Sequence, residues 1–180
     1  MQTDAVPYMN LGLALADAGR PADAEAAYRR ALTLAPKEIT RQRTNINLGM
    51  LLVERGDSDE AERLFTEANA IGGHAIAYRG LGLVARKRAQ TALRGGDTAT
   101  ATTELNRAHA ALTKAIAINP RYSQGHFTLG GVLYDAGQYR AALAEYQQAA
   151  ALAGDTSVGR QAAAAAQQLS DWLAQHPEAR

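Results

Sequence analysis

The chain has 180 residues, which is enough for one domain or a small pair, and it contains no cysteine, which excludes disulfides and thiolate metal sites. Nineteen basic residues against eighteen acidic ones leave a net charge of +1. This balance is too even to indicate nucleic acid, an anionic membrane or an acidic substrate as the target. Aromatic residues make up only 6% of a chain rich in alanine and leucine, which favours helices over strands.

The first predicted element is a pair of helices over residues 5–38. Gly19 is placed to end the first helix in the left-handed conformation, and Pro21 suits the first turn of the second helix. Pro36 is expected to end the second helix. The small residues Gly12 and Ala24 predict that the two helices approach closely. The spaced positions that define this unit are Tyr8, Leu11, Gly12, Leu15, Gly19, Ala24, Tyr28, Ala31 and Pro36.

The second predicted pair covers residues 42–74 and repeats the same pattern. Its positions are Asn45, Leu48, Gly49, Leu52, Gly56, Ala61, Phe65 and Ala68, with Gly73 where the first unit has proline. Gly56 should end the first helix, and Phe65 should fill the space beside the neighbouring pair. Asp57 and Glu60 form a predicted capping box at the start of the second helix.

The third predicted pair, residues 75–121, is longer than the others. It opens with Tyr78, Leu81 and Gly82 and closes with Pro120, and it exceeds a period of about 34 residues by about 14. The excess is centred on Gly95-Gly96, which adds roughly two turns, or about 10 Å, to each helix. The sequence therefore predicts a projecting helical hairpin with Asp97 as the cap of its second helix. A flexible loop is the alternative, although an apolar stripe at helical spacing continues through the segment.

The fourth predicted pair spans residues 123–156 and returns to the pattern of the first. Its positions are His126, Leu129, Gly130, Leu133, Gly137, Ala142, Tyr146 and Ala149, and it ends at Gly154. Residues 157–175 then carry apolar side chains along one side and polar ones along the other. This segment is predicted to be a terminal helix that covers the last pair, with Trp172 packed against it.

The first unit resembles the tetratricopeptide repeat, whose pattern it matches almost throughout. The second and fourth units are similar to it, although Asn45 stands where the family has an aromatic residue, and the third unit departs from the pattern through its extra length. The resemblance implies an all-α fold: a right-handed α-solenoid of four helix-turn-helix repeats, the third with elongated helices, followed by a C-terminal capping helix. Residues 1–180 are accordingly expected to form a single domain. The domain would stack apolar faces that no single pair can bury alone.

In the family that the chain resembles, the first helix of each pair lines a concave groove. The resemblance therefore places the binding residues on those helices. They are Met9, Asn10, Leu13, Arg43, Ile46, Asn47, Met50, Arg79, Leu83, Gln124, Phe127, Thr128 and Tyr134, with Val6 and Ile76 beside them.

The groove chemistry favours a hydrophobic or extended peptide as the ligand. Some relatives grip a terminal carboxylate, but of the aligned positions only Asn47 fits that arrangement, which disfavours it. Asn10 and Asn47 occupy equivalent places and are interpreted either as ligands for a peptide backbone or as tolerated polar groups. Apolar residues such as Met50 would be costly as ordinary surface.

No catalytic or cofactor-binding pattern is present in the sequence. The four histidines, at positions 74, 109, 126 and 176, lack metal-site spacing, and His109 is the one to inspect. No phosphate-binding loop or nucleophile motif occurs. The chain is therefore predicted not to be an enzyme and to need no metal or cofactor. The basic run Arg86-Lys87-Arg88 is interpreted as a solvated surface or, less favourably, as an anion-binding site.

The resulting hypothesis is a scaffold or adaptor that binds a protein or peptide partner, without nucleic acid and without membrane insertion. Two alternatives stay open: an accessory domain of a larger enzyme or secretion machine, and a self-assembling module that forms homo-oligomers. The first ten residues lack the basic start and apolar run of a secretory signal. The expected location is cytoplasmic if the chain is complete, and periplasmic or elsewhere if it is an excised domain.

Overall fold

The computed structural model describes residues 4–34 and 37–178, and these residues form nine α-helices and no strands. The chain divides into two compact units, Met1–Leu81 and Gly82–Arg180. The predicted all-helical architecture of four hairpins and a terminal helix is confirmed. Pro36 lies outside the described residues.

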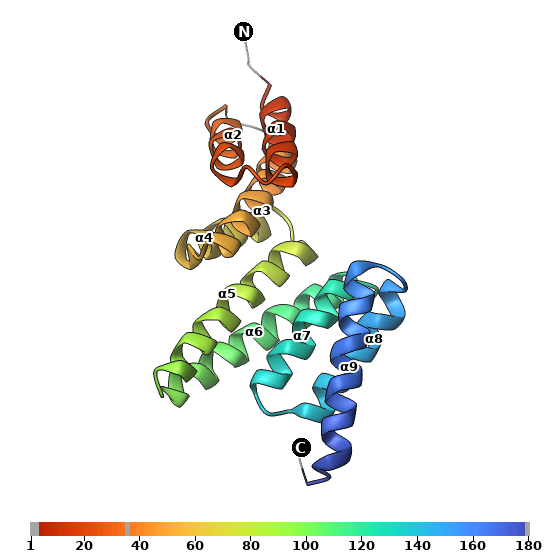
Figure 1. The fold of residues 1–180 in the computed structure, drawn as a ribbon. Coiled ribbons are helices and arrows are strands. Elements are labelled where there is room, and N and C mark those ends of the chain that lie inside the picture. Colours follow the sequence, from red (N-terminus) through yellow and green to blue (C-terminus); the bar gives the residue numbers. More distant parts are fainter. Residues whose placement is uncertain (1–3, 35–36, 179–180) are drawn as a thin grey trace. The chain divides into compact units, whose positions relative to one another are not determined.

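Unit 1 contains two antiparallel helix pairs and the start of a fifth helix (Figure 1). The pairs pack through small residues that face aromatic rings. A Cβ atom on Gly12 would come within 2.6 Å of the Tyr28 ring, and one on Gly49 within 2.8 Å of the Phe65 ring. Both rings are fully buried, as the sequence predicted. The helices are α1 (Val6–Asp17), α2 (Pro21–Thr33), α3 (Glu38–Arg55), α4 (Ser58–Ile71) and α5 (Ala75–Arg94), which continues into unit 2.

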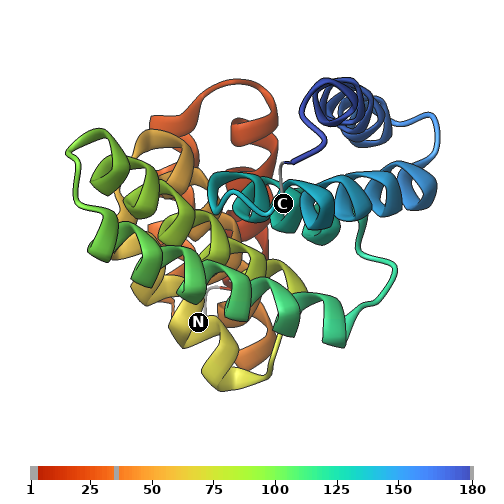
Figure 2. The ribbon, with the colours of Figure 1, turned by 90° about the horizontal axis from the view of Figure 1, so that it is seen from below.

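Unit 2 begins within α5 and contains α6 (Thr98–Ile118), α7 (Ser123–Asp135), α8 (Tyr139–Ala153) and α9 (Ser157–Gln175). The end of α5 and the long α6 form the extended hairpin, with the connecting turn at one end (Figure 2). Ala85 and Ala89 of α5 pack with Leu105 and Leu112 of α6 in one apolar cluster. The elongated third hairpin is therefore confirmed.

Helix ends follow the predicted chemistry at most positions. Gly19, Gly56 and Gly137 have positive φ angles of 71°, 105° and 74°, so each ends a helix in the left-handed region that glycine favours. Asp97 caps α6, because its Oδ1 accepts a hydrogen bond from the Thr100 N–H at 2.9 Å. The turns that join the hairpin helices were therefore predictable from local sequence.

The predicted capping box at the start of α4 is wrong. The Asp57 side chain makes no cap hydrogen bond and pairs with Arg55 instead. Glu60 accepts hydrogen bonds from both terminal nitrogens of Arg29, a residue of α2, at 2.8 and 2.9 Å. Glu60 therefore pairs with Arg29 of α2 and not with the backbone N–H at the start of its own helix.

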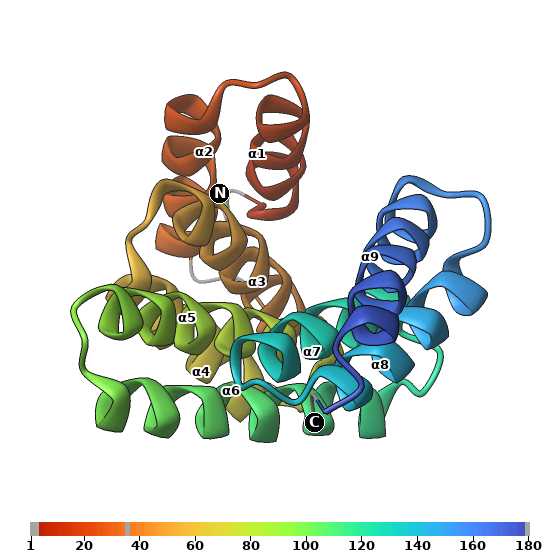
Figure 3. The same cartoon turned by 60° about the horizontal axis from the view of Figure 1, so that its bottom comes forward.

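The terminal helix α9 packs along α8 and also contacts α7 (Figure 3). Ala162, Ala166 and Leu169 are its buried apolar residues, and Leu169 joins the core cluster of the unit. The predicted covering role of this helix is confirmed. Within residues 4–34 and 37–178, no helix is long and apolar enough to cross a bilayer.

Candidate functional site

The predicted groove residues of unit 1 fall into exposed and buried groups. Asn10, Leu13 and Arg43 are exposed on α1 and α3. Asn47 and Met50 are half-buried on α3, and the half-buried Arg79 of α5 places its Nη2 atom 3.9 Å from the Met50 sulfur. Ile76 is half-buried, and Val6 is exposed.

Met9 and Ile46 require a correction, because each is only 4% exposed. Met9 packs with Ala5 and Ala31 in an apolar cluster. Ile46 lies on α3, which contacts α1, α2 and α4 and is therefore buried on more than one side. Their side chains belong to the core of unit 1.

The predicted groove residues of unit 2 divide in the same way. Gln124 and Tyr134 are exposed, whereas Leu83 and Phe127 are half-buried. Thr128 is buried, and its hydroxyl donates to the Gln124 carbonyl oxygen at 2.7 Å. Thr128 lies on α7, which is contacted by α6, α8 and α9. Its side chain is therefore packed inside unit 2 and does not face a groove. Thr128 is the third correction to the predicted set.

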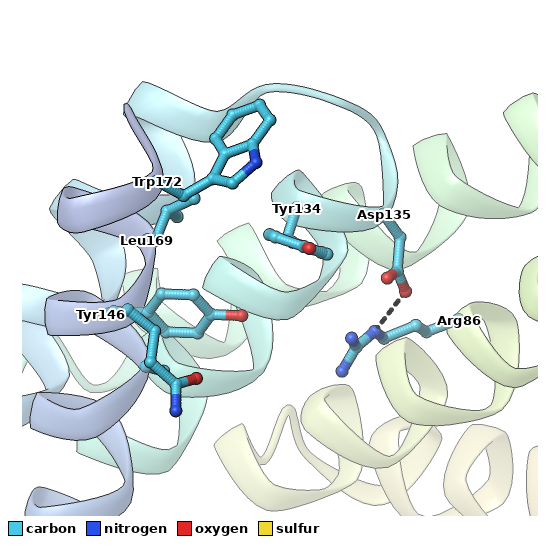
Figure 4. Close-up of a pocket in the computed structure, with 8 residues that line it drawn as sticks. Arg86, Tyr134, Asp135, Tyr146, Leu169 and Trp172 are labelled. Carbon is cyan, nitrogen blue, oxygen red and sulfur yellow. Dashed lines mark hydrogen bonds and ion pairs between the residues drawn. The ribbon is translucent and has the colours of Figure 1, made fainter. Parts of the chain in front are cut away.

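A cavity of about 440 Å³ opens in unit 2 among α5, α7, α8 and α9 (Figure 4). Tyr134 is the one predicted groove residue that lines it. Its lining combines charged and polar side chains with aromatic and aliphatic ones. The lining residues are Arg86, Tyr134, Asp135, Tyr146, Ala165, Gln168, Leu169 and Trp172.

Arg86 is the positive charge of this cavity and is held from two sides. Its Nε donates to Asp135 Oδ2 at 2.7 Å, and Gln90 Nε2 donates to the same oxygen at 2.9 Å. Its terminal atoms lie over Gly131, where a Cβ atom would come within 2.6 Å of the guanidinium carbon and 2.8 Å of Nη2. Any larger residue at position 131 would displace the guanidinium. The basic run therefore contributes one residue to a structured site.

The Tyr146 hydroxyl points into the cavity, toward the side on which Arg86 lies (Figure 4). Burial raises the pKa of this hydroxyl above its ordinary value, the Asp135 carboxylate adds to the rise, and the Arg86 charge opposes it. The group therefore stays protonated at neutral pH and can donate a hydrogen bond. Among the described residues, neither this hydroxyl nor the terminal nitrogens of Arg86 have a hydrogen-bond partner.

A row of aromatic rings borders the cavity. Tyr134 meets Tyr139 edge-on at 5.4 Å between ring centroids, and Tyr139 lies 4.8 Å from Trp172. Trp172 in turn stacks on His176 at 4.3 Å. The sequence predicted only that Trp172 packs against the last helix pair. In the structure its indole also forms part of the cavity wall.

The histidines considered in the sequence analysis do not form a binding site in the described residues. The His126 ring is buried between Glu145 Oε2 at 2.7 Å and the Pro120 carbonyl oxygen at 3.1 Å. His109 is exposed on α6. Within the part of the chain that the structure describes, no group of three histidine or carboxylate side chains could hold a metal ion.

Sequence reasoning missed most of the cavity. Arg86 and Asp135 are 49 positions apart, and no local motif connects them. The one available signal was the doublet Gly130-Gly131 in the interior of a predicted helix. The repeat pattern accounts for Gly130, which faces Tyr146, but it does not account for Gly131.

Helical hairpins with glycines seated under aromatic rings, repeated along a chain and closed by a terminal helix, define an all-helical repeat protein. Models of the tetratricopeptide repeat match residues 3–72 and residues 86–156, which together make up more than half of the chain. The chain belongs to the tetratricopeptide-repeat family.

Solved structures share this fold. TTC0263, a thermophilic TPR protein of Thermus thermophilus, is 24% identical with a TM-score of 0.78, over 97% of this chain and 89% of that one. A MamA structure is 19% identical with a TM-score of 0.62, over 99% and 92%. The human IFIT1 dimer with PPP-AAAA is 18% identical with a TM-score of 0.71, over 88% of this chain but only 34% of that one. No curated protein matches the sequence.

Proposed function

We propose that the chain is a non-catalytic scaffold that binds an extended peptide segment of a partner protein on α1 and α3 of unit 1. The tetratricopeptide-repeat fold itself supports a general role in protein interaction. The proposal adds the kind of ligand and the binding surface, and it excludes nucleic acid as the main partner because the net charge is only +1.

The observation that carries the proposal is apolar surface beside amide groups. Leu13 is 47% exposed and Val6 is 38% exposed. Asn10 lies between them at helical spacing, so all three share one face of α1. On α3, Asn47 and Met50 are half-buried three residues apart. Apolar side chains next to amides suit an extended peptide, whose side chains need apolar contacts and whose backbone needs hydrogen-bond partners.

The test is a selection of peptides from a displayed random library on the immobilised protein, followed by measurement of their affinities. Asn47→Asp combined with Met50→Glu should abolish binding of the selected peptides, because both changes place charge where apolar or amide contacts are needed. Ala26→Glu, at an exposed position on α2, is the matched control and should bind as the wild type does. Unchanged binding by the double variant would remove the proposal.

A further inference from the structure

We propose that the cavity of unit 2 is a receptor for the carboxylate of an acidic side chain in the bound partner. This inference rests on the proposed function, because it assumes a peptide ligand. It adds a second recognition element, built around Arg86 and separate from the α1 and α3 surface. Four observations support it: the fixed guanidinium, the donors without partners, the charge balance of the walls, and the mostly apolar wall of α9.

The guanidinium of Arg86 is positioned before any ligand arrives. Its Nε edge is held by Asp135, whose carboxylate is itself held by Gln90. Its flat end lies over Gly131, because only a residue without a Cβ leaves that space. Glycine weakens a helix interior, so its presence in α7 has a cost that the repeat pattern does not require. A side chain fixed in this way loses little freedom when it binds an anion.

Unsatisfied donors face the cavity. Among the described residues, the two terminal nitrogens of Arg86 donate to no other group, and the Tyr146 hydroxyl has no partner. Figure 4 shows the Tyr146 hydroxyl and the guanidinium pointing toward one another. A carboxylate can accept hydrogen bonds from both, and bonds to a charged acceptor are the stronger ones.

The charge balance favours a singly charged anion. Arg86 is the one basic residue among those that line the cavity, and its charge is paired with the Asp135 carboxylate. A phosphate dianion would bring a second negative charge with no further cation to meet it. A lysine or arginine side chain would bring its donors to walls that already present donors.

The remaining wall selects a side chain over a chain terminus. Ala165 and Leu169 of α9 and the ring of Trp172 make this wall mostly apolar, and Gln168 is the one polar side chain that α9 adds to it. The methylenes of a glutamate can lie against this wall while its carboxylate reaches Arg86. A terminal carboxylate would carry a backbone N–H into the same apolar region, where an unpaired donor is costly.

The experiment uses Trp172, the only tryptophan of the chain, as a fluorescent reporter in the cavity wall. The probes are acetyl-Leu-Glu-Leu-amide, its glutamine counterpart, and the glutamine peptide with a free terminal carboxylate. The glutamate probe should produce a saturable fluorescence change with an affinity at least about tenfold higher than the glutamine probe. Equal responses to glutamate and glutamine, no saturable response to glutamate, or preference for the free terminus would each overturn the proposal.

Two variants test the assignment to Arg86. Arg86→Gln removes the charge, and Gly131→Ala keeps it but displaces the guanidinium; each should lower the affinity for the glutamate probe by about tenfold or more. Arg94→Gln, an equal charge change at an exposed position at the end of α5, is the control and should bind as the wild type. Retention of glutamate preference in Gly131→Ala would refute the role of the fixed guanidinium. Wild-type binding of library-selected peptides, measured in parallel, separates failure here from failure of the proposed function.

Discussion

The adjacent glycines of α7 offer a matched test of the packing described above. We predict that Gly130→Ala lowers the stability of unit 2, whereas Gly131→Ala leaves it nearly unchanged or raises it. Both changes replace glycine by alanine in a helix interior and gain about 1 kcal/mol in helix propensity. The two variants therefore differ only in what the new methyl group meets.

The magnitudes follow from those surroundings. A Cβ on Gly130 would lie 2.6 and 2.7 Å from two atoms of the Tyr146 ring, which is packed against Phe127 at 5.6 Å between centroids. Overpacking of this kind costs about 1 to 3 kcal/mol, so the net loss is about 0 to 2 kcal/mol. The three atoms nearest to a Cβ on Gly131 all belong to the guanidinium of Arg86, which is held by its ion pair with Asp135 and not by core packing. Displacing it weakens a partly exposed ion pair with Asp135 that contributes about 1 kcal/mol or less.

Urea unfolding monitored by Trp172 fluorescence measures both variants, because this tryptophan lies in the same unit. Circular dichroism at each urea concentration checks that the helices unfold together with the fluorescence change. Gly131→Ala should be the more stable variant by up to about 3 kcal/mol. The reasoning is refuted if Gly130→Ala equals or exceeds it in stability.

Three further predictions concern the scaffold. The Arg29 hydrogen bond lowers the pKa of Glu60 below its ordinary value. The stability that this carboxylate contributes is present above the ordinary pKa and is lost as the pH falls through the folded pKa. Glu60→Gln should therefore flatten the acid limb of a stability–pH curve measured by urea unfolding. Gly80→Ala should destabilise the wild type, because its Cβ would meet the Phe65 ring, but should be neutral or stabilising in a Phe65→Leu background; equal effects in both would contradict this contact. Asp97→Ala should speed amide hydrogen exchange in the first turn of α6 and leave the other helices unchanged.

Most of the fold could be predicted from the sequence because its determinants are local. A glycine such as Gly56, which alone tolerates the required φ, marks a helix end within a few residues of itself. Small residues and rings recur at fixed spacing, and Gly12 and Tyr28 meet as the repeat pattern implies. The capping box failed for the opposite reason. Glu60 had an alternative partner, Arg29, on another helix, and local spacing carries no information about such competition.

The binding residues were harder to predict because burial depends on how many helices surround a given one. The rule that the first helix of a pair faces a groove placed Met9, Ile46 and Thr128 on a surface. In the structure α3 and α7 each contact at least three other helices, which bury more than one stripe of side chains. Leu13 and Tyr134 stay exposed, at 47% and 48%, although they lie on the same kind of helix.

The glycines of this chain differ in which group a Cβ atom would meet, and this difference distinguishes packing positions from candidate functional ones. At Gly12, Gly49 and Gly130 that direction meets a tyrosine or phenylalanine ring of the paired helix, so the glycine is required for close packing. At Gly131 it meets the guanidinium of Arg86, which is half-buried at the wall of a cavity and contributes little apolar packing. Glycine lowers helix stability at both kinds of position. Of these four glycines, Gly131 is the one that leaves room for a fixed charge with unused hydrogen-bond donors. That difference is the physical reason for placing recognition at Arg86 rather than elsewhere along the basic run.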